Sequence, residues 1–570
     1  MRSNFTILII FSLFSFTFGE DTAYPQDYFA VPVTGALRLS GTFGELRPGH
    51  FHAGIDIKGS VGDAILAAAE GYVSLISISP DGYGKALYLS HPNGYTTVYA
   101  HLAHFTPELD AYVRSHQYAA ESFSVGLHPE PGQFTFEKGA VIGAMGLTGS
   151  SLGPHLHFEI RGRQGEWVVN PLNFGLPVAD SQPPKMQRLR LYAIDEQGGA
   201  SFLKETGLRE SRAGAYRLEQ ADTLYTSAPK ASLALDVFDR QDGAPNRNGI
   251  YDLKLFYNDS LAFDFNMEYF RREETRYLNA HLDFKALWEG RHYFNRVYRM
   301  PGNALSNYRQ DKGVIALRPG EAAKVRLEAS DIKGNTTELA FWLKRLPGEI
   351  KAGRPYYNYY LPYGEASIIQ TPSLSLYFPD SSLYENLYLD YQPVLEDSYG
   401  VYSLVHHVHY PGTPLHKSFQ IGIRPTLMIP DHLRGKAFIA YCAGGNAIVN
   451  CGGVWEDGFL QTRAHALGAY CILTDDEPPS IEPLNLREDM GRAASMAFRI
   501  SDNYKTAGNV PGLQYRGTID GHWVLFEYDA KRNRLEYFFE DSLAQGEHQL
   551  RLEVKDAMGN VGVFEQRFRR

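Results

Sequence analysis

Alternating side chains between positions 155 and 159 restrict the fold of this chain more than any other feature. His155, His157 and Glu159 alternate with Leu156 and Phe158. Residues two apart in an extended strand point to the same face, and a polar face opposite an apolar one is typical of a half-buried strand. The sequence therefore predicts a strand that buries one face in a core and carries two imidazoles and a carboxylate on the other.

Two earlier segments supply further groups of the same kind, His52-Ala-Gly-Ile-Asp56 and Tyr99-Ala-His101-Leu102. Two neutral imidazoles and one carboxylate suit zinc, whose catalytic sites use three protein ligands and leave a fourth position for water. Two more imidazoles would then remain for proton transfer. The pattern indicates a zinc hydrolase with one Zn²⁺ per chain.

The spacing of the first segment predicts a bend. Residues four apart on a straight strand, such as His52 and Asp56, are separated by about 13 Å at the backbone, too far for their side chains to meet easily on one ion. Gly54 lies midway between them. A glycine inside a strand pattern often marks a bulge or a close approach of two backbones, so we expect one of these at Gly54.

Several stretches in the order and spacing found here resemble the lysostaphin/LytM-type zinc endopeptidase family, over about Ser40 to Pro171. These stretches are Phe43-Gly-Glu-Leu-Arg47, His52-Ala-Gly-Ile-Asp56, Gly82-Tyr-Gly84, Ser90-His91, Tyr99-Ala-His101-Leu102, Gly146-Leu-Thr-Gly149 and Gly153-Pro-His155-Leu-His157-Phe-Glu159.

The resemblance implies a role for each of five residues. His52, Asp56 and His157 would be the zinc ligands, while His101 and His155 would be the unligated catalytic pair that orients the attacking water and the developing oxyanion. Peptide hydrolysis would proceed by attack of zinc-bound water. Glu159 is a candidate to hydrogen-bond a ligand imidazole from behind.

The sequence departs from the family pattern at one point. Some relatives have a tyrosine shortly before the first ligand that assists the oxyanion, whereas this stretch contains Arg47 and His50 instead. Either is a candidate substitute. We expect His50, His91 and His104 otherwise to be ordinary surface or core residues, because a lone histidine is far more often structural than a ligand.

The start of the chain has the pattern of an export signal. A short basic beginning precedes an apolar run from Ile7 to Phe18, and Gly19-Glu-Asp21 follows. The run is shorter than the roughly 20 residues of a spanning helix, and no cysteine lies nearby to accept a lipid. We predict a signal peptide at residues 1–19, an exported chain that is periplasmic, in the cell envelope or secreted, and no stable membrane span in the mature protein.

Composition bounds the remaining architecture. The 570 residues are 44% hydrophobic and suggest three or four domains of ordinary size. A net charge of −10 gives no electrostatic case for a nucleic-acid partner. Aromatic residues make up 13%, including 37 tyrosines, which favours strands.

The predicted fold class is therefore mainly β: an antiparallel lysostaphin-type peptidase domain followed by β-sandwich modules of immunoglobulin-like type. Proline pairs and acidic residues suggest a peptidase domain at residues 20–178, a sandwich at 179–347, a β-rich domain at 348–476 and a final sandwich at 477–570. A turn pattern recurs near the ends of the two sandwiches, as Asp331-Ile-Lys-Gly-Asn335 and Asp556-Ala-Met-Gly-Asn560. This echo indicates two related modules.

Other segments leave alternatives open. Cys442 and Cys451 flank a plausible hairpin turn, so a cross-strand disulfide and reduced buried thiols are both compatible with the pattern, and Cys471 would be left over. Thr106-Pro-Glu-Leu-Asp110 resembles a helix start in an insertion that is either a lid over the cleft or a stabilising flap.

The function predicted from these patterns is an exported zinc metalloendopeptidase that hydrolyses peptide bonds. The family resemblance supplies its partner, peptidoglycan cross-links or stem peptides, although another extended peptide is also compatible. Two alternatives remain: a noncatalytic envelope scaffold that regulates a partner hydrolase, and a protease for exported proteins. In either case the carboxyl-terminal β modules are a possible surface for a protein partner.

Overall fold

The computed structural model describes residues 24–162, 165, 167–348, 356–395, 400–442, 444 and 447–570. The predicted export signal at residues 1–19 lies outside these ranges. We use the predicted boundaries to name region 1 (24–178), region 2 (179–347), region 3 (356–476) and region 4 (477–570). Among the described residues, no helix is both long and apolar enough to span a membrane.

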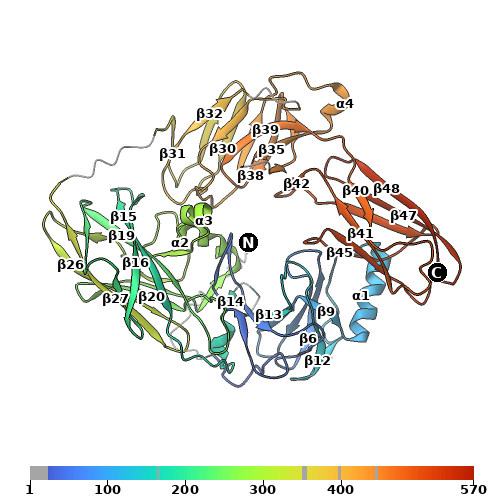
Figure 1. Cartoon of the computed structure of the whole chain (residues 1–570), viewed down its shortest axis with the longest axis horizontal. Coiled ribbons are helices and arrows are strands. Elements are labelled where there is room, and N and C mark those ends of the chain that lie inside the picture. The colour runs from blue at the N-terminus through green and yellow to red at the C-terminus, as the bar shows by residue number, and fades with distance from the viewer. Residues whose placement is uncertain are drawn as a thin grey trace, which may run out of the picture.

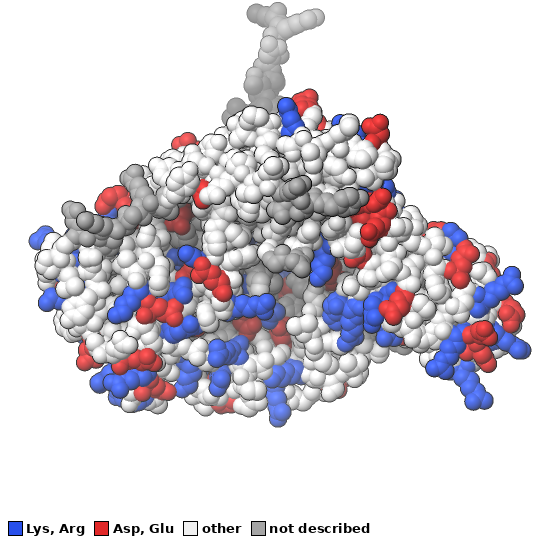
Figure 2. All heavy atoms as spheres, turned by 45° about the horizontal axis from the view of Figure 1, so that its top comes forward, with Lys and Arg blue, Asp and Glu red and all other residues white. Residues whose placement is uncertain are grey.

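Strands dominate all four regions, so the predicted mainly β class is confirmed. The regions follow one another around a ring in Figure 1, from blue through green and orange to red. Region 4 returns to region 1, where Lys85 pairs with Glu527 at 2.9 Å and Arg114 pairs with Glu540 at 2.9 Å. On the face drawn in Figure 2, basic and acidic side chains are interspersed.

Region 1 is built on an antiparallel sheet with the strand order β1-β4-β13-β8-β7-β6-β10, and a smaller sheet has the order β5-β12-β9. Apolar side chains such as Ile55, Leu156 and Phe158 form its core. The elements are β1 (Leu39–Gly41), β2 (Leu46–Arg47), β3 (His50–Phe51), β4 (Ile55–Lys58), β5 (Ala64–Leu66), β6 (Gly71–Ile78), β7 (Lys85–Ser90), β8 (Thr96–Ala100), β9 (Leu102–Phe105), α1 (Pro107–Ala120), β10 (Val125–Leu127), β11 (Thr135–Phe136), β12 (Val141–Met145), β13 (His155–Arg161) and β14 (Trp167–Val169).

The predicted helix after Thr106 is present as α1, with Pro107 in its first turn. The Thr106 hydroxyl makes no capping hydrogen bond. The helix lies against region 4: the Tyr118 hydroxyl donates to Glu540 at 2.8 Å, and the Tyr118 ring packs on Trp523 with centroids 5.0 Å apart. The insertion therefore contributes to closing the ring (Figure 1).

Region 2 contains long strands that pack around a large apolar core. One of its strands, β22, pairs with β14 and so continues the sheet of region 1. Its main elements are β15 (Lys185–Ile194), β16 (Ala200–Arg212), β17 (Ala215–Leu218), β18 (Thr223–Thr226), β19 (Lys230–Phe238), β20 (Asp252–Tyr257), β21 (Ser260–Asn266), β22 (Tyr269–Arg271), α2 (Leu278–His281), α3 (Phe284–Gly290), β23 (Phe294–Arg296), β24 (Tyr308–Asp311), β25 (Ile315–Ala316), β26 (Ala322–Ser330) and β27 (Thr336–Arg345).

Region 3 contains a two-stranded, a five-stranded and a six-stranded sheet, and the last of these includes β42 (Lys505–Thr506) of region 4. Region 4 contains two four-stranded sheets, and each region has its own apolar core. None of Cys442, Cys451 and Cys471, all within the described ranges, forms a disulfide bond. The longer elements are β30 (Leu374–Phe378), β34 (Phe419–Ile423), α4 (Asp431–Arg434), β35 (Ala437–Cys442), β38 (Phe459–Ala464), β39 (Gly468–Thr474), β41 (Ser495–Ser501), β43 (Gln514–Ile519), β46 (Arg534–Phe538), β47 (Glu547–Lys555) and β48 (Val561–Arg569).

Candidate metal centre

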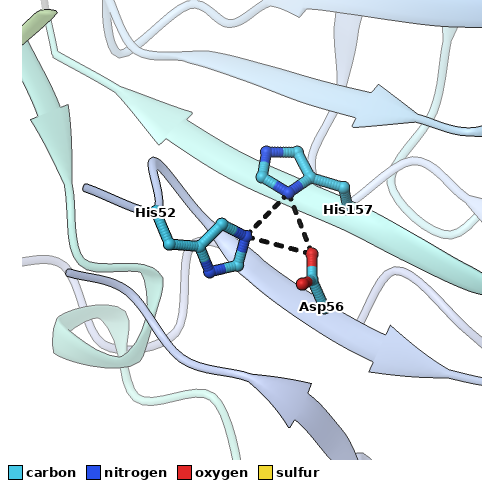
Figure 3. A group of neighbouring side chains, drawn as sticks. All are labelled: His52, Asp56 and His157. Carbon is cyan, nitrogen blue, oxygen red and sulfur yellow. Dashed lines mark hydrogen bonds and ion pairs between the residues drawn. The ribbon is translucent and has the colours of Figure 1, made fainter. Parts of the chain in front are cut away.

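Three donor atoms converge in region 1, on His52, Asp56 and His157 (Figure 3). His52 Nε2 lies 3.0 Å from Asp56 Oδ1 and 3.0 Å from His157 Nδ1, and the last two atoms are 2.9 Å apart. Ligand atoms on one tetrahedral zinc ion are separated by roughly 3.3 Å, given metal–ligand distances near 2.0–2.2 Å. The three residues that the resemblance implied as ligands therefore lie in a geometry that fits one small cation.

Strand pairing creates this convergence. Asp56 on β4 lies directly opposite His157 on β13 in the antiparallel register, so their side chains leave the same face of the sheet as neighbours. His52 follows β3 and reaches them through the bend at Gly54. A Cβ at Gly54 would lie 2.3 Å from the Phe158 carbonyl oxygen, which is the close backbone approach predicted for this glycine.

The ring nitrogens of His52 and His157 that face away from the cluster each have a hydrogen-bond partner. His52 Nδ1 lies 2.7 Å from the Thr42 carbonyl oxygen, which can only accept, so Nδ1 carries the proton and Nε2 presents its lone pair to the cluster. In His157 the two ring nitrogens have exchanged roles. Its Nε2 lies 2.9 Å from Glu159 Oε1 and carries the proton, while its Nδ1 faces Asp56. Both imidazoles are thus oriented as metal ligands require.

Glu159 is fully buried and is itself fixed by two neighbours. Arg161 donates from Nε to Glu159 Oε2 at 2.8 Å, and the Tyr83 hydroxyl donates to Oε1. Glu159 was a candidate for this orienting contact from the sequence, whereas Tyr83 and Arg161 were not. Arg161 continues the alternation of β13, and Tyr83 lies between Gly82 and Gly84, so both signals were present in the sequence.

His101 and His155 stand beside the cluster. The His101 ring centroid is 4.8 Å from that of His155 and 6.0 Å from that of His157. Each ring has Nδ1 next to a backbone carbonyl oxygen, at 2.9 Å from Thr148 for His101 and 2.8 Å from Gly153 for His155. His155 Nε2 lies 3.5 Å from Asp56 Oδ1, so this nitrogen faces the donor cluster.

Of the two candidate substitutes for the missing tyrosine, only Arg47 reaches the cluster in the described geometry. Arg47 Nη2 donates to Asp56 Oδ2 at 2.6 Å and to Glu45 Oε2 at 3.2 Å. His50 is exposed, and its Nδ1 lies 3.2 Å from the Pro48 carbonyl oxygen.

Burial and charge set the protonation of the cluster. Burial lowers the pKa of His52 to about 4 and, with the neighbouring imidazoles, lowers the pKa of His101 to about 3. Burial acts in the same direction on His157, but hydrogen bonds to Asp56 and Glu159 outweigh it and raise its pKa to about 9. Burial and the nearby Asp56 raise the pKa of Glu45 to about 7 despite Arg47.

Two oriented imidazoles and a carboxylate, with further imidazoles alongside, are a donor set that zinc accepts in proteins. Comparison with known proteins points to a family of peptidases. Residues 50–132 match the model of Peptidase family M23, and residues 358–475 match that of the Zu5-like domain. The resemblance to the lysostaphin/LytM-type family is thereby confirmed for the amino-terminal part of the chain.

Characterised relatives match the same part. The DD-carboxypeptidase/endopeptidase Mpg of Neisseria meningitidis is 33% identical over 148 residues, which are 25% of this chain and 28% of that protein. The murein hydrolase activator NlpD of Escherichia coli is 32% identical over 153 residues, 27% of this chain and 32% of that protein. The chain thus spans less than a third of the length of these relatives.

Among solved structures, a zinc-containing peptidase from Vibrio cholerae is 25% identical and is matched over 27% of this chain and 41% of that chain, with a TM-score of 0.20.

Proposed function

We propose that this protein is an exported zinc-dependent endopeptidase that hydrolyses peptide bonds in peptidoglycan. The convergence of His52, Asp56 and His157 within 3.0 Å carries the proposal. These three residues would hold the ion. When bound, zinc would supply a Lewis acid that polarises the scissile carbonyl and lowers the pKa of water.

His101 and His155 would move protons in this reaction. With Nδ1–H donating to the Thr148 carbonyl and a pKa lowered to about 3 by burial, His101 is neutral near pH 7, and its Nε2 is an acceptor. It would take a proton from the attacking water and return it to the leaving amine nitrogen. In its imidazolium form, with Nδ1–H on the Gly153 carbonyl oxygen, His155 would donate from Nε2, which faces Asp56, to the developing oxyanion.

Arg47 gives the carboxylate of Asp56 a second fixed partner. Its guanidinium binds Oδ2, which leaves Oδ1 toward the imidazoles of His52 and His157. We assign Arg47 a positioning role, because it would limit Asp56 to one ligand oxygen.

Peptidoglycan as substrate and export as destination rest on different observations. The likeness to a DD-carboxypeptidase/endopeptidase and to a murein hydrolase activator supports the substrate class. The basic start and apolar run before Gly19 support export.

The test is release of soluble muropeptides from purified peptidoglycan, with zinc measured in the same sample. Zinc near one per chain and cleavage by the unmodified protein, lost in His155→Ala and kept in His104→Ala, would support the proposal. His104 is a matched control because its exposed ring lies outside the cluster.

A regulatory role is the second candidate, favoured by the 32% identity to an activator of murein hydrolases. In that case the chain would bind zinc yet release no muropeptides alone. It would instead increase the release by a separate murein hydrolase, and His155→Ala would leave that increase unchanged. A protease for exported proteins would cut an unfolded polypeptide but not peptidoglycan.

A further inference from the structure

Two groups of three aspartates lie far from the candidate metal centre, one at each junction that leads into a predicted sandwich. Asp180, Asp239 and Asp331 gather where region 1 passes into region 2, and Asp475, Asp502 and Asp556 gather where region 3 passes into region 4. In each group, one oxygen from every carboxylate lies within 4.8 Å of the others.

The two groups repeat one sequence pattern. The first aspartate begins Asp-x-x-Pro-Pro, at Asp180 and at Asp475. The second directly follows strand β19 or β41, and the third begins Asp-x-x-Gly-Asn before the last long strand, β27 or β48. Three separate segments of each module therefore deliver one carboxylate each to the same place.

The hydrogen bonds of one asparagine side chain repeat as well. The Asn335 side-chain amide donates to Asp331 Oδ2 at 2.7 Å and to the Asp180 carbonyl oxygen at 3.2 Å. Asn560 makes the equivalent bonds, to Asp556 Oδ2 at 2.7 Å and to the Asp475 carbonyl oxygen at 3.0 Å. The incoming linker is thus tied to the Asp-x-x-Gly-Asn turn in both modules.

The first group has buried polar atoms that no protein group satisfies. Asp239 is only 3% exposed, and its Oδ1 has no hydrogen-bond partner. Asn248 is also 3% exposed, and both atoms of its side-chain amide lack partners. The two residues lie opposite each other in an antiparallel bridge, so their side chains are neighbours on one face. A buried carboxylate oxygen and a neutral amide oxygen are therefore available beside Asp180 and Asp331.

Within the described ranges neither Lys nor Arg forms an ion pair with any of the six aspartates, although the charge of Lys333 acts on Asp180 from a greater distance. Burial and the neighbouring carboxylates raise the pKa of Asp239 to about 8 and that of Asp180 to about 6. In the second group Asp502 Oδ1 is likewise a buried atom without a partner, although Asp502 as a whole is half-buried. Like charges this close require either a shared proton or a cation.

We propose that each aspartate group binds one calcium ion. The donors are oxygens only, with no His or Cys in either group, which favours a hard cation over zinc. Oxygen ligands lie about 2.3–2.6 Å from Ca²⁺, so two of them on one ion are at most about 5 Å apart. The carboxylate oxygens of each group, all within 4.8 Å of one another, are close enough to meet this condition. Backbone carbonyls, amides and water can complete its irregular shell more easily than the strict octahedron of Mg²⁺.

Calcium at these positions would stiffen the two junctions. Each ion would bind the linker, the end of one strand and the turn before another, and so would fix the direction in which a module leaves the preceding region. Region 4 returns to region 1 through Lys85 and Glu527, so both junctions affect the closure of the ring in Figure 1.

The experiment is calorimetric titration of the full mature chain, loaded with one equivalent of zinc and freed of other cations, with CaCl2. We expect two Ca²⁺ per chain, one in Asp239→Asn, one in Asp502→Asn and none in the double variant. Asp195→Asn is the matched control, an exposed aspartate of region 2 outside the group, and should bind two. His157→Ala, titrated without added zinc, should also bind two, because the zinc ligands are separate.

Thermal unfolding of the unmodified chain gives a second readout that needs no variant to fold: calcium should raise its midpoint. Absence of calcium uptake by the folded, unmodified chain at millimolar CaCl2 would overturn the proposal, and a shared proton would then account for the buried carboxylates. Uptake that persists in the double variant would overturn it equally. Neither readout depends on peptidase activity.

Discussion

The histidine–aspartate cluster of region 1 and the aspartate groups at the two junctions each bring three donors together. They differ in the hydrogen-bond partners of the donor side chains. In the first cluster the rear atoms of His52 and His157 are held by Thr42 and Glu159. In the aspartate groups, Asp239 and Asp502 each keep a buried oxygen without a partner. An oriented nitrogen-rich set suits an ion that takes part in chemistry, whereas an oxygen set assembled from three segments suits an ion that joins them.

The largest effect should come from removing one proposed zinc ligand. His157→Ala should abolish zinc binding, because only two donors would remain. His155→Ala should keep the zinc and lower turnover by at least about 10²-fold, since it removes only a proton donor. Zinc content and muropeptide release on the same samples measure both. Full activity in either variant would contradict the assignment.

Much of this cluster was predictable from the sequence because it depends on local spacing and on pairing of adjacent strands. The alternation around His157 predicted the strand β13, and Gly54 predicted the close approach that brings His52 toward Asp56. The sequence left open whether Arg47 or His50 would reach the cluster, because neither spacing nor periodicity shows which side chain of a hairpin points inward. The structure places Arg47 on Asp56.

The aspartate groups were only partly visible in the sequence. The sequence predicts the two turns that begin at Asp331 and Asp556. The other aspartates of each group come from segments up to 151 residues away in the chain. The hydrogen bonds from Asn335 to Asp180 and from Asn560 to Asp475, which span 155 and 85 residues, illustrate this distance. Long-range convergence of this kind leaves no periodic signal. The predicted boundaries of the two sandwiches stay a prediction.

A smaller effect should follow from loosening the support behind a zinc ligand. Glu159→Gln keeps the shape but removes the charge that holds the Nε2 proton of His157. We expect zinc affinity to fall by about 10–100-fold, the usual cost of losing such a partner. Competition against a chromophoric chelator measures it. Glu137→Gln, at an exposed glutamate, is the control. An unchanged affinity would mean that His157 is oriented by packing alone.

The aspartate groups should respond to pH in a way that distinguishes a proton from calcium. Burial and two neighbouring aspartates raise the pKa of Asp239 from 3.8 to about 8, so the folded protein holds a proton that the unfolded chain loses near pH 4. The free energy of unfolding should therefore fall as pH rises from about 4 to 8, by at most about 1.4 kcal/mol per pH unit from this group.

Denaturant unfolding across this pH range, without calcium, measures the slope. Asp239→Asn should flatten it, because an amide does not titrate, and Asp195→Asn should not. Saturating calcium should also reduce the fall in the unmodified chain, since the ion replaces the proton. If Asp239→Asn and the unmodified chain had parallel profiles, the carboxylate would be ionised throughout, and the electrostatic conflict inferred for the group would not exist.

The smallest effect concerns the amide ties that the two modules share. Asn335→Ala and Asn560→Ala each remove two hydrogen bonds that join the linker to the turn, so each should lower the free energy of unfolding by about 1 kcal/mol. Asn560 is 7% exposed, whereas Asn335 is half-buried, so the loss should be larger at Asn560, where water cannot replace the amide. Denaturant midpoints in calcium-free buffer compare them. A larger loss at Asn335 would show that the two junctions, despite their common pattern, are not held in the same way.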